Sequence, residues 1–183
     1  MATTKTRMTA QDYKQLPETA QPMELIDGEI IVSPTPKLTH QMISIRLSSL
    51  LTQIVTRGMV IAAPMDVYLD GQNAVQPDVF WVSGPDSLCK RGEDDYLYGA
   101  PDLVCEILSP GTVKRDRQTK FILYEIHGVK EYWLLDQANQ LIEVYTRQEE
   151  KLILTEAYHQ TQFTSPLLQR EIDTHIIFAG WFE

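Results

Sequence analysis

The sequence predicts a mixed α/β (α+β) fold, in which helices flank a mixed central β-sheet. Short apolar stretches bounded by turn residues recur along the chain and indicate strands. Residues 40–57 carry the clearest helical periodicity, and residues 101–136 are typical of a strand, a turn, a helix and a second strand. A helix that crosses between strands, followed by a hairpin, indicates helices packed on a mixed sheet.

The length of 183 residues predicts one domain over residues 1–183, with a short N-terminal helical arm over about residues 1–20. Hydrophobic residues make up 43% and charged residues 22% of the chain, which is ordinary for a folded globular protein. No apolar run approaches the ~20 residues of a transmembrane helix, and the first residues carry no secretory signal. We therefore expect a cytoplasmic protein without a membrane partner.

The formal net charge of −9 argues against a protein that coats nucleic acid, because such proteins are basic. It is compatible with an enzyme that has a local basic patch and a bound metal to offset its acidic residues. The two cysteines do not form a disulfide framework. We expect Cys105 in a buried strand and Cys89 in a polar loop.

The N-terminal third of the chain predicts a helix, a hairpin and a second helix. Thr9 can N-cap a short helix over residues 10–16. Asp27-Gly28 is typical of a type I′ turn between two short strands. Thr39 is a candidate N-cap for the helix over 40–57, and Gly58 supplies its stop. The apolar stripe of that helix comprises Ile43, Leu47, Leu50, Leu51, Ile54 and Val55.

The remaining elements follow from the same signals. Two short strands flank Pro64, one strand is expected over 74–83, and residues 84–100 resemble an exposed loop. A strand over 102–108 leads through a turn to a helix over about 115–127, with Gly128 as its C-terminal cap. Three strands then form a meander: "KEYWLLD", "LIEVYTR" and "KLILTEAY".

Two carboxylates stand within or beside apolar strand residues, Asp78 in "QPDVFWV" and Glu106 in "PDLVCEIL". A buried carboxylate needs a cation, a metal or several hydrogen bonds. On adjacent strands these two acids could share one divalent ion, and oxygen ligands suit Mg²⁺. Alternatively, Asp78 simply starts a strand, and Glu106 forms a buried ion pair with Lys120 or an arginine.

The helix after this strand adds Asp116 and Lys120, which are four residues apart and share one face with Tyr124. If the helix packs on the sheet, Lys120 can point at the acids, orient a nucleophile and stabilise developing negative charge. Its alternative is a pair with Asp116 on the helix surface.

The stretches "QPDVFWV", "PDLVCEILSP" and "RDRQTKFILYEIHGVKEYWLLD" resemble the putative restriction endonuclease family of the PD-(D/E)XK nuclease superfamily. The segment "MELIDGEIIVSPTP", followed by His40 at a helix start, is also similar to the N-terminal half of that family. The resemblance covers about residues 9–147 and implies a restriction-endonuclease-like fold.

The resemblance implies that Asp78 is the metal-binding aspartate, that Glu106 is the second acid, and that Glu24 is an early acid of the site. In the superfamily the lysine follows the second acid by two residues, but Leu108 stands there in this chain. The sequence is similar to the branch in which the lysine has moved to the following helix, which points to Lys120.

This reading predicts an endonuclease that uses Mg²⁺ (or Mn²⁺) to hydrolyse phosphodiester bonds in DNA. The expected substrate contacts are His40, Lys114, Arg115 and Tyr124, although Lys114 and Arg115 also suit an ordinary solvated helix start. The resemblance implies a homodimer, and the segment "HIIFAGWFE" is a candidate interface unless it completes the core. The alternatives are a catalytically silent nuclease-fold protein with a binding or regulatory role, and a hydrolase of a small phosphorylated molecule.

Overall fold

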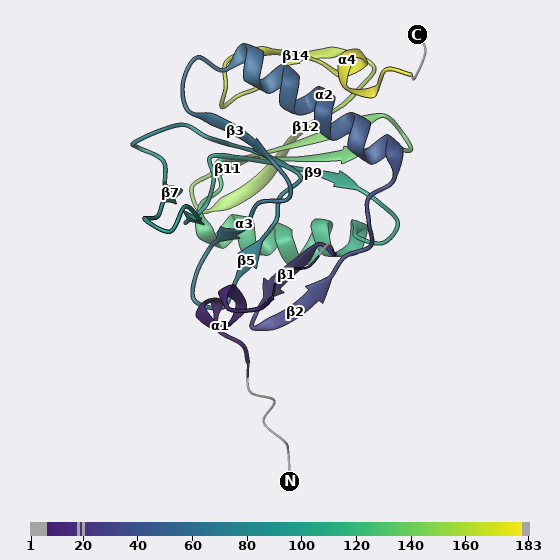
Figure 1. Cartoon of the computed structure of the whole chain (residues 1–183). Coiled ribbons are helices and arrows are strands. Elements are labelled where there is room, and N and C mark those ends of the chain that lie inside the picture. Colours follow the sequence, from purple (N-terminus) through teal and green to yellow (C-terminus); the bar gives the residue numbers. More distant parts are fainter. Residues whose placement is uncertain (1–6, 18, 20, 181–183) are drawn as a thin grey trace.

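A computed structural model describes residues 7–17, 19 and 21–180 of the protein (Figure 1). Its helices are α1 (Ala10–Lys14), α2 (Leu38–Ile54), the short π-helix η1 (Arg115–Lys120), α3 (Phe121–His127) and α4 (Thr174–Phe178). Its strands are β1 (Met23–Ile26), β2 (Glu29–Val32), β3 (Met59–Ala62), β4 (Val67–Tyr68), β5 (Ala74–Val75), β6 (Val79–Val82), β7 (Lys90–Arg91), β8 (Leu97–Tyr98), β9 (Leu103–Leu108), β10 (Glu131–Asp136), β11 (Leu141–Gln148), β12 (Lys151–His159), β13 (Gln162–Thr164) and β14 (Glu171–Asp173).

A mixed sheet forms the centre of the molecule, with the strand order β12-β11-β10-β9-β6-β3. Among the described strands of this sheet, β9 and β10 form the only parallel pair. A parallel pair needs a crossover connection, and η1 and α3 provide it between β9 and β10. In Figure 1 α2 crosses one face of this sheet and α3 lies along the opposite face. The predicted α+β class, a mixed sheet flanked by helices, is confirmed.

The alternation of side chains along β9 separates two hydrophobic cores. Leu103, Cys105 and Ile107 pack toward α2 with Trp133. Val104 and Leu108 pack toward α3 in the other cluster. Because side chains alternate between the two faces of a strand, Glu106 lies on the α3 face, inside the molecule. This face carries the candidate site.

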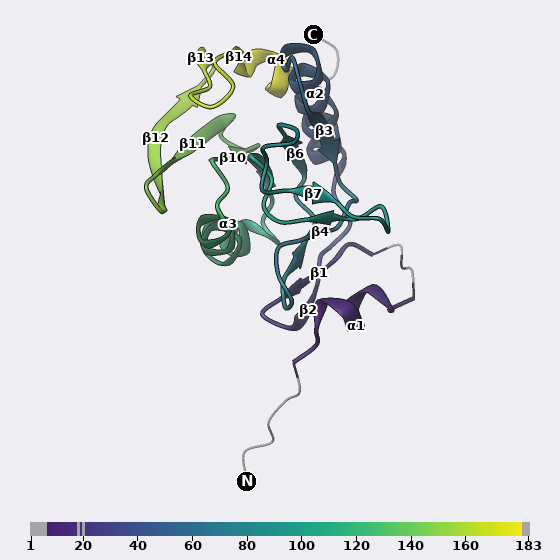
Figure 2. The ribbon, with the colours of Figure 1, turned by 90° about the vertical axis from the view of Figure 1, so that its left-hand side faces the viewer.

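A second sheet, with the order β2-β1-β5-β4-β8-β7, packs on the same side of the central sheet as α3. Figure 2, turned by 90°, shows α3 end-on beside the curved central strands. In this view β13 and β14 lie at the top of the molecule, and β1 and β2 lie below the level of α3. Ile26, Val67 and Val75 of the second sheet share a core with Phe80 and Tyr124. The two sheets and α3 therefore enclose the region around Glu106.

Several local predictions are confirmed. Thr9 caps α1 through a reciprocal capping box with Asp12. Asp27 and Gly28 adopt positive φ angles of 50° and 73° in the turn between β1 and β2, as a type I′ turn requires. Gly128 ends α3 in the left-handed region at φ 94°.

The predicted start of the long helix is wrong. α2 begins at Leu38, after Lys37 in an extended conformation, so Thr39 lies inside the first turn and does not cap the helix. The predicted end is also wrong, because the helix ends at Ile54 with Val55 extended, and Gly58 is not its stop. Of its predicted stripe, Ile43, Leu47 and Leu51 are buried against the central sheet.

The predicted continuous strand over 74–83 is also wrong. β5 and β6 belong to different sheets, and the chain crosses from one to the other at residues 76–78. Pro77 has no N–H for a strand ladder, and the Gln76 N–H bonds to the Glu24 carboxylate instead of a strand partner. This crossing brings Asp78 out of the regular sheet beside the candidate site.

Residues 84–100 are not simply an exposed loop. They contain β7 and β8, which extend the second sheet, and Leu97 is buried. Cys89, which we expected in a polar loop, is only 1% exposed, and burial raises the pKa of its thiol to about 12. Cys89 and Cys105 are both unpaired thiols inside the protein.

The termini lie partly outside the described residues. The predicted arm over 1–20 includes α1, but residues 1–6, 18 and 20 fall outside. The C-terminal candidate interface begins in α4, where Ile177 is buried and Ile176 is exposed, and residues 181–183 fall outside the description. No helix in the described part of the chain is both long and apolar enough to cross a membrane.

Glu131 ties the central sheet to the C-terminal segment and supplies a test of this fold. Its buried carboxylate accepts hydrogen bonds from Trp133 Nε1 at 2.7 Å, Ser165 Oγ at 2.7 Å and Leu167 N at 2.8 Å. Glu131→Ala leaves these buried donors unpaired, so we expect it to lower the free energy of unfolding by about 3 kcal/mol in urea denaturation. The exposed control Glu150→Ala should change it by less than about 0.5 kcal/mol. Equal effects of the two substitutions would contradict the anchoring role of Glu131.

Candidate active site

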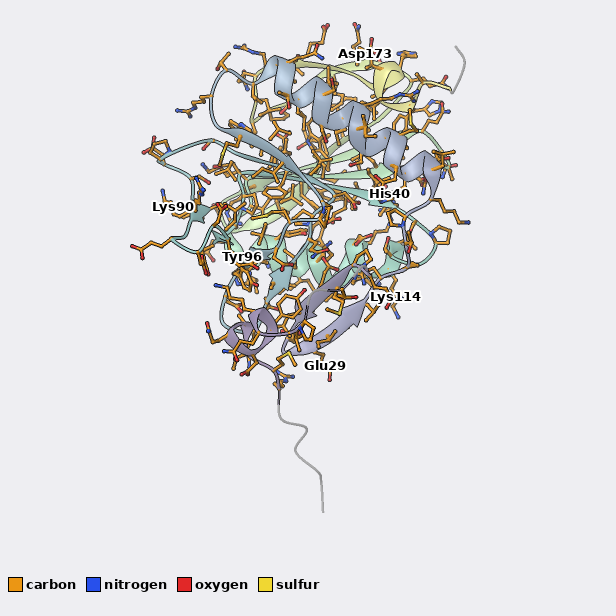
Figure 3. All side chains as sticks on the ribbon, viewed as in Figure 1. Glu29, His40, Lys90, Tyr96, Lys114 and Asp173 are labelled. Carbon is orange, nitrogen blue, oxygen red and sulfur yellow. The ribbon has the colours of Figure 1, made fainter. Side chains whose placement is uncertain are left out.

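A cavity of about 640 Å³ opens between the first turns of α2, the helix η1 and strand β1. Figure 3 labels His40 and Lys114 at this end of the molecule, where α2 and η1 begin. A volume of this size is typical of a pocket for a small molecule or a segment of a larger one. The charged side chains that line it are Glu24, His40, Asp78, Glu106, Arg115, Asp116 and Lys120, together with Lys37 at its rim.

Asp78 and Glu106 come from neighbouring antiparallel strands. The register pairs Val79 of β6 with Cys105 of β9, so Asp78, one residue before β6, lies beside Glu106. One oxygen of Asp78, Oδ2, accepts a hydrogen bond from the N–H of Ile107 at 2.7 Å. The two carboxylates that the sequence assigned to adjacent strands therefore lie side by side in the cavity.

Lys120 lies between two carboxylates that come from different sheets. Its Nζ is 2.6 Å from Glu106 Oε1 and 2.8 Å from Glu24 Oε1. All three side chains are almost completely buried. The alternative of a surface pair between Lys120 and Asp116 is wrong, whereas the buried ion pair of Glu106 with Lys120 is present.

The π-helix explains how Lys120 reaches the acids. Residues 115–120 form η1, a wider helix whose hydrogen bonds span five residues, and its inner face buries Asp116 and Lys120. One turn further on, the Tyr124 hydroxyl donates a 2.6 Å hydrogen bond to Glu106 Oε1. Glu106 Oε1 thus accepts from both Lys120 and Tyr124, which fixes its orientation.

Glu24 is held by the crossing segment and by Arg115. Its Oε1 accepts from the Gln76 N–H at 3.0 Å, in addition to Lys120. Its Oε2 forms an ion pair with Arg115 Nε at 3.5 Å but is buried without a hydrogen bond. Arg115 donates to Ser33 Oγ at 2.7 Å, which keeps the guanidinium at the cavity wall.

His40 lies in the first turn of α2 and faces Asp78. Its Nε2 is 3.2 Å from Asp78 Oδ2, and its Nδ1 is buried without a hydrogen-bond partner. Burial alone would lower the pKa of His40, but the hydrogen bond to Asp78 and the charges of Asp78 and Asp116 raise it on balance. The acids beside His40 therefore favour its protonated form.

Four carboxyl groups line the cavity, those of Glu24, Asp78, Glu106 and Asp116, and the cations set deepest among them are Lys120 and Arg115. Burial raises the pKa of Glu106 well above its usual range, and although Lys120 opposes this, the charges of Asp78, Asp116 and Glu24 raise it further. Burial alone would lower the pKa of Lys120, but the surrounding carboxyl groups outweigh burial and raise it. An additional positive charge beside Asp78 and Glu106 is therefore favourable.

These features fit a divalent ion held by two carboxylates. The described residues contain no group of three or more His, Cys, Asp or Glu side chains arranged to hold a metal ion. Mg²⁺ needs no such cage, because it commonly binds one or two carboxylates and fills its other positions with water and substrate phosphates. Asp78, Glu106 and the Glu24 oxygen that accepts no hydrogen bond offer the hard oxygen ligands that this ion prefers.

Of the four predicted substrate contacts, the structure places two in the cavity lining and two outside it. His40 and Arg115 line the cavity. Lys114 is exposed and is not part of the lining. Tyr124 is fully buried behind Glu106, so the expected direct substrate contact does not fit its position.

The sequence reading missed Gln76 and Ser33. Gln76 binds Glu24 through its N–H, and its side-chain amide donates to Asp66 at 2.9 Å. Ser33 holds Arg115. The one available signal was that Gln76 directly precedes Pro77-Asp78.

The fold and the buried acids define a restriction-endonuclease-like protein. A family model described as "Putative restriction endonuclease" matches residues 10–175, so the chain belongs to this family, as the sequence resemblance predicted. The family places the protein among nucleases, which are hydrolases.

Individual proteins agree with this assignment. An uncharacterized protein from Synechocystis sp. is 28% identical over 149 residues, which cover 79% of this chain and 76% of the relative. The crystal structure of a protein described as a putative nuclease, from Anabaena variabilis, has a TM-score of 0.76 and 23% identity to this chain. That match covers 94% of this chain and 98% of the other, and it shows the same fold.

The charge balance around Lys120 can be tested through stability. Lys120→Met removes the cation shared by Glu24 and Glu106, and breaking a buried pair in this way costs about 3–5 kcal/mol. When the pKa of a carboxyl group is higher in the folded than in the unfolded state, the free energy of unfolding falls as the pH rises from the unfolded-state pKa to the folded-state pKa. Without Lys120 the pKa of Glu106 rises further, so urea unfolding should show a larger loss at pH 8 than at pH 5.

The matched control is Lys114→Met, at the exposed lysine that precedes η1. It should change the free energy of unfolding by less than about 0.5 kcal/mol at both pH values. A Lys120→Met effect that is small, or equal at pH 5 and pH 8, would rule out the proposed charge balance.

Proposed function

We propose that the protein is a divalent-metal-dependent endonuclease that hydrolyses phosphodiester bonds in DNA. The observation that carries the proposal is the buried cluster of Lys120 with Glu24 and Glu106, which meets Asp78 in a cavity open to substrate. Membership in a nuclease family supports the reaction class.

In this proposal Asp78 and Glu106 hold Mg²⁺ or Mn²⁺. When bound, such an ion stabilises negative charge on the phosphate and makes a nearby water more acidic. The Ile107 N–H and the Tyr124 hydroxyl orient these two carboxylates, so that little rearrangement is needed for binding.

Lys120 has two roles in the proposed reaction. Its ammonium group holds the carboxylates of Glu24 and Glu106 at fixed positions. It also supplies positive charge where negative charge develops on the phosphate. Glu24 has one oxygen that accepts no hydrogen bond, and this oxygen can accept a proton from the attacking water. His40 and Arg115 stand at the cavity wall, where they can contact phosphate oxygens.

The family relationship also motivates the proposal of a cytoplasmic homodimer, because cutting both strands of DNA requires two sites. The exposed part of α4, around Ile176, belongs to the segment that the sequence offered as an interface.

A catalytically silent binding protein is the second candidate. The contact of Lys120 with both acids favours it, because this cation already neutralises part of the charge that a metal would meet. The net charge of −9 also disfavours tight binding to DNA. The two functions differ in whether the wild-type protein binds a metal and cleaves DNA.

The metal-holding role of the acids is tested by Asp78→Asn and Glu106→Gln. Each removes a negative oxygen ligand at nearly constant volume, so we expect Mn²⁺ affinity in calorimetry and plasmid cleavage to fall together by about 10–100-fold or more. Glu156→Gln, at an exposed position on β12, is the control and should change neither quantity. Metal binding that survives both site substitutions would disprove this assignment.

Lys120→Gln separates charge stabilisation from metal binding. Because the substitution removes positive charge from an acidic cluster, Mn²⁺ affinity should stay the same or increase, while cleavage falls by about 100-fold or more. Circular dichroism checks that the variant is folded under the assay conditions. Cleavage at the wild-type rate would exclude a role for Lys120 in the reaction.

The wild-type protein distinguishes the remaining functions in the same assays. DNA binding without metal binding or cleavage would favour the silent protein. Hydrolysis of bis(p-nitrophenyl) phosphate without affinity for DNA would favour a hydrolase of small phosphorylated molecules.

A further inference from the structure

The acids of the candidate active site lie at the floor of the cavity and not on the outer surface. Glu24, Glu106 and Lys120 each expose 4% or less of the side chain. Asp78 and Arg115, nearer the opening, expose 20% and 17%. A phosphate that reaches a metal between Asp78 and Glu106 must therefore enter the cavity, together with the sugar and the base attached to it.

Two loops meet at one side of the cavity and form part of its wall. They are the connection from β2 to α2 and the connection from β9 to η1, which Figure 1 shows close together at the edge of the molecule. A Cβ atom at Gly111 would lie only 3.2 Å from Pro34 Cγ, so the two loops are in contact. Arg115 joins them again through its 2.7 Å hydrogen bond to Ser33 Oγ. A wide ligand therefore cannot lie across the cavity on this side.

Apolar surface surrounds the charged floor. Among the described residues that line the cavity are the prolines Pro22, Pro34, Pro36, Pro64 and Pro110. Their rings are rigid, and their nitrogen atoms carry no hydrogen to donate to a phosphate. A surface that held only the backbone of a duplex would present mainly charged and hydrogen-bonding groups. The proline walls instead suit a sugar and an unstacked base on either side of the phosphate.

Cations are few in and around this cavity. The lysine and arginine side chains among its described lining residues are Lys37, Arg115 and Lys120. Arg115 and Lys120 already form ion pairs with Glu24. Tight binding to a duplex commonly neutralises about 6–10 phosphates with lysine and arginine. The cations of this site, in a chain of net charge −9, suit a short segment of one strand.

We propose that the site takes a single strand of DNA, unpaired over the nucleotides that enter the cavity, and excludes an intact duplex. This inference rests on the proposed endonuclease function and specifies the form of DNA that is cut. The 640 Å³ cavity has the volume of a pocket for a drug-sized ligand, comparable with about one or two nucleotides. The major groove of B-DNA alone is about 12 Å wide, so a duplex must open before one of its phosphates reaches the floor.

The first experiment compares a labelled strand of about 20 nucleotides with the same strand annealed to its complement, both with Mn²⁺. Because opening a duplex costs base pairing and stacking, the single strand should be cut at least about 10-fold faster. A duplex with a central unpaired bubble should be cut inside the bubble. A negatively supercoiled plasmid should be nicked faster than the same plasmid after relaxation, because supercoiling favours strand opening. Equal or faster cutting of the intact duplex would overturn the inference and leave the endonuclease proposal standing.

A substitution inside the cavity tests whether the strand enters it. Ser44 lies on α2, lines the cavity and is only 9% exposed. Ser44→Leu adds apolar volume there without changing charge, so single-strand cleavage should fall by about 10-fold or more while Mn²⁺ affinity stays within about 2-fold of wild type. Ser49→Leu makes the same change at an exposed position of the same helix and should alter neither quantity.

Circular dichroism verifies that the variants are folded. If Ser44→Leu does not fold, Gln41→Trp at an exposed lining position replaces it and should reduce single-strand cleavage in the same way. Cleavage at the wild-type rate by a folded variant of this kind would overturn the inference.

Failure of the endonuclease proposal gives a different result. If none of these substrates is cut, fluorescence anisotropy with the same oligonucleotides at saturating Mn²⁺ still tests the site. Tighter binding of the single strand than of the duplex, lost in Ser44→Leu, supports the inference for a protein that binds without cutting. Equal or tighter binding of the duplex overturns it. Hydrolysis of bis(p-nitrophenyl) phosphate without affinity for either oligonucleotide also overturns it and assigns the cavity to small phosphodiesters.

Discussion

The centre of this protein depends on one interaction, the buried ammonium group of Lys120 between the carboxylates of Glu24 and Glu106. The distances are 2.8 Å and 2.6 Å, and no partner in this triad is more than a few per cent exposed. Glu24 belongs to the second sheet, Glu106 to the central sheet, and Lys120 to the helix that crosses between β9 and β10. The interaction therefore joins three elements that are distant in the sequence, and removal of Lys120 leaves two buried carboxylates without their shared cation.

The same interaction explains why the lysine comes from a helix. Two residues after Glu106 the strand carries Leu108, whose side chain points to the same face and is buried in the apolar cluster. That position serves packing, so it does not supply a cation. The π-helix η1 brings Lys120 and Asp116 inward at the start of the crossover, and Lys120 takes up the position beside Glu106. Strand alternation and the widened helix together place two acids and one cation at the floor of an open cavity.

Local sequence signals predicted most of what positions the site. The apolar flanks of Glu106 indicated a buried strand, and Gly128 marked the end of the crossover helix, so the β9–η1–α3–β10 unit could be expected. The helical spacing of Asp116 and Lys120 offered the lysine as a candidate, and the family resemblance then indicated Lys120 and Glu24. What could not be predicted depends on contacts between distant segments, such as Gln76 with Glu24 and Arg115 with Ser33. The break between β5 and β6 and the strands within 84–100 were missed for the same reason, because they are set by pairing in the second sheet.

The central claim is that Asp78 and Glu106 form a divalent-metal site beside an intact Lys120–Glu24 contact. Anomalous diffraction from crystals soaked in Mn²⁺ tests it most directly, because it locates the ion and the lysine in one experiment. The account predicts an anomalous peak in contact with carboxylate oxygens of both Asp78 and Glu106, while Lys120 Nζ stays within hydrogen-bond distance of Glu24. An absent peak at saturating Mn²⁺, or a peak at other side chains only, would contradict it and leave the buried triad as a structural ion pair.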